Sequence, residues 1–92
     1  QDLYILGALH EVAFVKTKQV RFLEASKKYY LLGLELGPKR PQVLYGMFDI
    51  CRIEGNVECA KKIGGQILEQ WPDDEKTRAF LADFLNRAAG GS

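Results

Sequence analysis

The side chains that could carry out chemistry are few in this chain, and their spacing argues against a catalytic centre. His10 is the single histidine, and it falls on an apolar stripe of the first predicted helix, which favours a packed role. Cys51 and Cys59 are eight residues apart on two predicted helices, and without further cysteines or histidines they make a poor zinc site. The acidic run 73–75 fits the electropositive start of a helix better than a metal site. Because the HExxH, P-loop and GxSxG patterns are also missing, we expect no enzymatic activity, no metal and no cofactor.

The two cysteines therefore bear on stability rather than on catalysis. They allow at most one disulfide, too few for a small scaffold held together by cross-links. Because unpaired cysteines are common in apolar interiors, we expect Cys51 and Cys59 to be free thiols.

Composition indicates one small globular domain without a strong charge. The 92 residues are 47% hydrophobic and 27% charged, and the formal net charge is +1. Nucleic-acid binding needs a strong basic excess, so we exclude it, and no apolar run is long enough to predict direct membrane insertion. The chain starts at Gln1 and ends in Gly-Gly-Ser, which leads us to expect a segment of a longer protein.

Turn-forming residues divide the chain into five segments, each long enough for a helix. The breaks fall at 16–18, 38–41, 55–56 and 72–74. Within each segment apolar residues recur at three- and four-residue steps, which predicts helices and argues against strands. Pro41 suits the first turn of a helix, Gly55 suits the left-handed residue that ends one, and Asn56 suits the N-cap of the next.

An internal repeat with a period of 34 residues is the strongest pattern in the sequence. Residues 23–38 and 57–72 align without a gap, and six of the 16 positions are identical. A fixed period of this length, with paired helices, is typical of arrays of stacked helical hairpins.

Residue types within each repeat point to a known family. In the central unit, Leu44 and Met47 hold the apolar positions of the first helix, and the turn, the small position of the second helix and the terminal proline position are held by Gly55, Ala60 and Pro72. The preceding unit supplies Leu3, Leu6, Gly7, Ser26, Tyr30 and Pro38. In these positions the sequence resembles the tetratricopeptide repeats. It departs from their pattern at Phe48, where a small residue is usual, and at Gly64, where an aromatic is usual.

The resemblance implies an all-α fold of about two and a half tetratricopeptide hairpins, with five helices in a short right-handed α-solenoid. A single domain, 1–92, would then hold a first repeat at 1–38, a second at 41–74 and a capping helix at 75–88. The first repeat would need a longer internal turn around 15–20.

The family's mode of binding implies a function for the inner face of the first helices, which commonly holds an extended peptide. The matching positions in this sequence are Tyr4, Ala8, Glu11, Gln42, Tyr45, Asp49, Arg52, Lys76, Asp83 and Asn86. Tyr45 would offer a flat contact surface, and Arg52 would clamp a carboxylate. In the alternative, Asp49 and Arg52 pair with each other along the helix. We therefore predict a non-catalytic module that binds a protein or peptide partner.

Two further hypotheses remain open. The string 38–45 resembles the segment between repeats in the tetratricopeptide tails of bacterial O-antigen ligase/polymerase-type membrane enzymes. The chain would then be a soluble accessory domain of such an enzyme, and otherwise a soluble cytoplasmic domain. The third hypothesis is self-association through the terminal helix, whose apolar residues are Phe80, Leu81, Phe84 and Leu85.

Overall fold

The computed structural model describes residues 2–90, and these form five helices without a strand, as the periodicity predicts. The helices are α1 (Leu3–Thr17), α2 (Val20–Leu36), α3 (Pro41–Ile53), α4 (Val57–Gln70) and α5 (Glu75–Gly90). Gln1 and the last two residues of the expected domain 1–92 lie outside the described residues.

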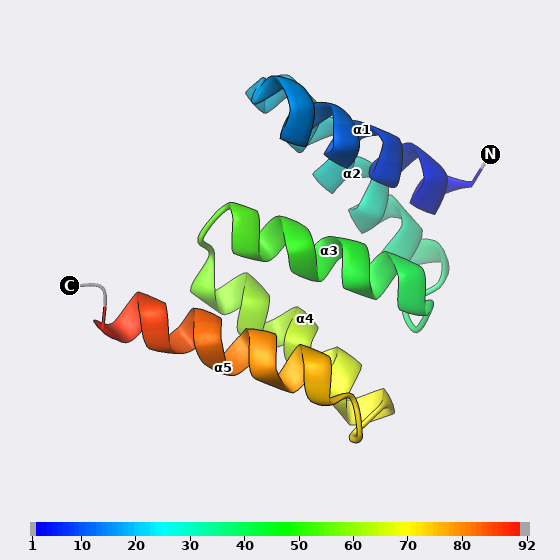
Figure 1. Ribbon diagram of the computed structural model, residues 1–92. Helices are drawn as coiled ribbons and strands as arrows, with labels where there is room; N and C mark the ends of the chain where they lie inside the picture. Colours follow the sequence, from blue (N-terminus) through cyan, green and yellow to red (C-terminus); the bar gives the residue numbers. More distant parts are fainter. Residues whose placement is uncertain (1, 91–92) are drawn as a thin grey trace.

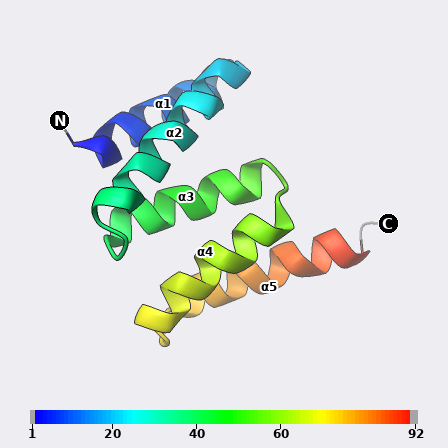
Figure 2. The same cartoon turned by 180° about the vertical axis from the view of Figure 1, so that it is seen from behind.

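The helices form two layers, as Figures 1 and 2 show from opposite sides. Helices α1, α3 and α5 lie in one layer, and α2 and α4 lie in the other, so that consecutive helices form hairpins joined by short turns. Helix α3 occupies the centre. Its side chains Val43, Leu44, Ile50 and Cys51 have no exposed surface, because both neighbouring hairpins cover this helix.

Local signals in the sequence account for the helix ends. Pro41 is the first residue of α3, Gly55 has a left-handed φ of +66°, and Asn56 accepts a hydrogen bond of 3.0 Å from the backbone N–H of Cys59. The longer turn expected around residues 15–20 is absent. The turn consists of Lys18, in the left-handed conformation, and Gln19, because the extra residues lengthen α1 and α2 instead.

Tyr30 of α2 sets how α1 and α3 approach each other. Its side chain is 1% exposed and its ring lies against Gly7 of α1 and Gly46 of α3. A Cβ atom at Gly7 would lie 2.6 Å from two ring atoms, and one at Gly46 would meet the ring equally closely. Both helices therefore need a residue without a side chain at this point. On the preceding turn of α2, Ser26 donates a hydrogen bond of 2.7 Å to the carbonyl oxygen of Gly7, which satisfies this buried hydroxyl.

The two departures from the repeat pattern compensate each other in space. A Cβ atom at Gly64 would lie 3.1 Å from the Phe48 ring and 3.2 Å from Leu81, so both side chains pack directly over the bare backbone of Gly64. The large residue on α3 thus fills the space that the small residue on α4 leaves open.

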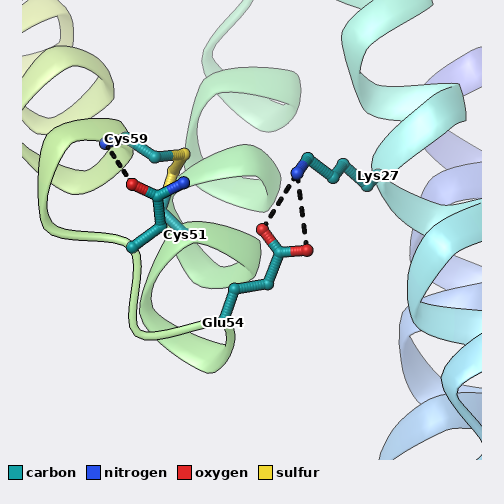
Figure 3. The surroundings of a disulfide bond; sticks show 5 residues. Lys27, Cys51, Glu54 and Cys59 are labelled. Carbon is teal, nitrogen blue, oxygen red and sulfur yellow. Dashed lines mark hydrogen bonds and ion pairs between the residues drawn. A yellow bond between two sulfur atoms is a disulfide. The ribbon is translucent and has the colours of Figure 1, made fainter.

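The expectation of free thiols is wrong, because Cys51 and Cys59 form a disulfide (Figure 3). Cys51 lies near the end of α3 and Cys59 in the first turn of α4, and the tight turn at Gly55 brings their Cα atoms to 5.4 Å. The bridge closes the α3–α4 hairpin beside the ion pair of 3.0 Å between Lys27 and Glu54, which ties α2 to the same turn.

Candidate interaction grooves

Two neighbouring grooves open on the layer of α1, α3 and α5 within the described part of the chain. The first groove runs between α1 and α3 and encloses about 510 Å³. It is lined by Tyr4, Ala8, Glu11, Val12, Val15, Lys16, Tyr30, Gln42, Tyr45, Gly46 and Asp49. The second groove runs between α3 and α5, encloses about 370 Å³, and is lined by Tyr45, Phe48, Asp49, Asp74, Lys76, Thr77 and Phe80. Because Tyr45 and Asp49 line both, the two grooves adjoin along α3.

The floor of the first groove is polar and contains two acidic side chains. Tyr30 donates a hydrogen bond of 2.8 Å from its hydroxyl to Oε1 of Glu11. Burial raises the pKa of Glu11, the Tyr30 hydrogen bond opposes this change, and the nearby Asp49 carboxylate adds to it. Burial likewise raises the pKa of Asp49, and Arg52 counteracts this effect. Burial and the neighbouring Glu11 also raise the pKa of the Tyr30 hydroxyl, which therefore stays a hydrogen-bond donor.

Tyr45 is 38% exposed and stands at the ridge between the two grooves. Its ring stacks on Trp71, with 6.2 Å between ring centres, and its hydroxyl donates a hydrogen bond to Asp74. This bond raises the pKa of Tyr45 and lowers that of Asp74. Asp74 also accepts from the Thr77 backbone N–H at 3.0 Å, which caps the start of α5. The aromatic ring is thus held in place with part of its surface free for contact.

Arg52 is engaged within the domain and lines neither groove. Its guanidinium lies 3.4 Å from the carboxylate of Asp49, and its centre lies 4.5 Å from the Phe80 ring. Of the two roles open for Arg52, the pairing with Asp49 is the one observed. A ligand carboxylate would have to compete with this contact and with the aromatic ring.

The remaining predicted site residues divide into two groups. Tyr4, Ala8, Glu11, Gln42, Tyr45, Asp49 and Lys76 line the grooves. Asp83 and Asn86 line neither groove, since both are exposed farther along α5, where Asp83 forms an ion pair of 3.1 Å with Arg87. The predicted site did not include several lining residues, which are Val12, Val15, Lys16, Tyr30 and Gly46 in the first groove and Phe48, Asp74, Thr77 and Phe80 in the second. The helical spacing from Ala8 and Glu11 could have pointed to the two valines, whereas nothing local relates Tyr30 to this face.

Large apolar side chains that are exposed to solvent are more numerous on α1 than on α5. In α1 the exposed fractions are 52% for Ile5, 61% for Leu9, 52% for Val12 and 52% for Val15. In α5, Leu81 and Phe84 pack against the core, and Phe80 is 39% exposed beneath Arg52. Self-association through α5 stays a prediction, which light scattering would test.

Comparisons of the chain with protein-family models, with curated proteins and with solved structures found no match. Among residues 2–90, no group of three or more His, Cys, Asp or Glu side chains is arranged to hold a metal ion. In the same part of the chain, no helix combines the length and the apolar character needed to cross a membrane.

Proposed function

We propose that this domain is a non-catalytic interaction module that holds an extended protein segment along the layer of α1, α3 and α5. The observation that carries the proposal is the pair of adjoining grooves, which share Tyr45 and Asp49. Together the grooves offer apolar walls, aromatic surface and polar groups, a combination typical of binding sites.

We also propose that the fold belongs to the tetratricopeptide type. The domain would be about two and a half tetratricopeptide hairpins, with repeats at 1–38 and 41–74 and a capping helix after residue 75. The repeat period, the two-layer order of the helices and the small residues at close helix contacts support it.

Selection of random peptides tests the binding proposal without knowledge of the natural partner. A displayed library of 12-residue peptides is selected against the folded domain, and enriched peptides are then titrated by calorimetry. Ala8→Trp, which fills the first groove, should weaken binding at least tenfold. Ala82→Trp, exposed on α5 and outside both grooves, should bind as the unchanged protein does. Equal affinities of the two variants, with both folded by circular dichroism, would place binding elsewhere.

A second candidate is the accessory domain of a bacterial O-antigen ligase/polymerase-type membrane enzyme. The Cys51–Cys59 disulfide favours it, because such bonds persist in oxidising compartments, outside the cytoplasm. The complete reading frame tests this candidate. Several apolar stretches of about 20 residues in the same frame would support it, whereas further 34-residue units without such stretches would favour a scaffold.

A further inference from the structure

The first groove joins apolar walls to an acidic floor. Ala8, Val12 and Val15 of α1 form one wall, and the ring of Tyr45 on α3 forms part of the other. Glu11 and Asp49, one from each helix, stand between these walls. A ligand that enters the groove therefore loses water against apolar surface and meets the carboxylates of Glu11 and Asp49.

The carboxylate of Glu11 has no ion-pair partner in the part of the chain that the structure describes. Its hydrogen bond comes from the neutral hydroxyl of Tyr30, and no lysine or arginine among residues 2–90 lies within ion-pair distance of it. Asp49 has a single ion pair, with Arg52 at 3.4 Å, and this guanidinium is also held over Phe80. Among residues 2–90, Glu11 is therefore the groove carboxylate without an ion pair, beside Asp49, which pairs with Arg52.

We propose that this groove binds a lysine or arginine side chain of the partner segment, with the cationic head against the neighbouring carboxylates of Glu11 and Asp49. The methylene stem of such a side chain would pack against the valines and Tyr45, as long basic side chains do when their heads are charged. This inference rests on the proposed function, since it assigns the partner chemistry of the same groove.

Other ligand chemistries fit the groove less well. An anion would meet two carboxylates, and a purely apolar side chain would remove water from Glu11 without replacing its hydrogen bonds. The charged groups facing the groove are Glu11, Lys16 and Asp49, with Arg52 and Lys76 beside Asp49. Lys16 lies near the end of α1, five residues beyond Glu11, and is in none of the ion pairs observed among residues 2–90.

The test compares peptides selected from one random library by two forms of the protein. The unchanged domain should enrich peptides with a central lysine or arginine, and the isosteric double variant Glu11→Gln/Asp49→Asn should not. An Asp83→Asn variant serves as the control, because it removes an exposed carboxylate of α5 outside the grooves.

A selected peptide then allows a direct measurement of the contact. Replacing its basic residue by norleucine should weaken binding at least tenfold to the unchanged domain and less than twofold to the double variant. Peptides that bind without basic enrichment, or that bind both forms equally, would overturn this inference and leave the proposed function standing. Failure to select any peptide would overturn both.

Discussion

Replacement of Gly46 by alanine tests how tightly the Tyr30 ring is held between α1 and α3. The new Cβ atom would point at the Cζ and Cε1 atoms of this ring, which is almost fully buried and also touches Gly7. The ring cannot move away without disturbing α1 and breaking the hydrogen bond from its hydroxyl to Glu11. The matched control is Gly65→Ala on α4, where a Cβ atom would have no neighbour within 4 Å.

The expected magnitudes have opposite signs. In a helix interior, alanine is more favourable than glycine by about 1 kcal/mol, and Gly65→Ala should gain most of this. At Gly46 the same gain is set against overpacking, which costs about 3 kcal/mol where the neighbours are rigid. The variant should therefore lose about 2 kcal/mol, and the melting temperatures of the two variants should differ by about 15 °C in a domain of this size.

Thermal and urea unfolding followed by circular dichroism measure both variants. A third variant, Tyr30→Ala, removes the ring, and in this background Gly46→Ala should stabilise the domain as Gly65→Ala does. If Gly46→Ala raised the melting temperature in the unchanged background as well, the ring would not occupy the space between the two helices, and the account of the groove floor would be refuted.

Two more predictions follow from the disulfide and from the groove floor. Reducing the Cys51–Cys59 bridge should destabilise the domain by about 2.6 kcal/mol, the loop-closure value for a ring of about nine residues. Reductant should therefore lower the melting temperature of the unchanged protein but not that of Cys59→Ala. Alkylation of both cysteines in the denatured, unreduced protein would contradict the bridge. The pKa values of Glu11 and Asp49 are raised above their ordinary values of 4.5 and 3.8, so the folded state holds their protons more tightly than the unfolded state. Their contribution to stability is therefore present below the ordinary values and is lost as pH rises through the raised ones. Glu11→Gln should be more stable than the unchanged protein at pH 7 and should lose this advantage near pH 3, as urea unfolding at the two pH values would show; a constant difference would contradict the assignment.

The hairpin turn shows how far local signals reach. Gly55 and Asn56 predict where α3 ends and α4 begins, because a left-handed glycine and a capping asparagine act through their own backbone neighbours. The same turn brings Cys51 and Cys59 together, but spacing alone could not predict their bond, since its formation depends on how the two helices face each other in space.

The groove residues likewise divide into those that the sequence pattern predicts and those that depend on how the helices pack. Helical periodicity places Ala8, Glu11 and Val12 on one face of the first helix, and repeat spacing relates the third helix to it. The pairing of Arg52 with Asp49 was one of two alternatives, and only side-chain positions could choose between them. Asp83 and Asn86 follow the repeat pattern but lie outside the grooves, because the pattern describes helix faces and does not describe where neighbouring helices leave a cavity.

The amino-acid sequence by itself determined the five helices, the turn at Gly55 and Asn56 and the 34-residue period, since each depends on interactions between residues close together in the chain. Only the tertiary structure decided that the two cysteines are bonded, that the Tyr30 ring packs against Gly7 and Gly46, and that Glu11 and Asp49 line the same groove. These features join residues from different helices, and their distances follow from packing, which balances the shapes of many side chains at once.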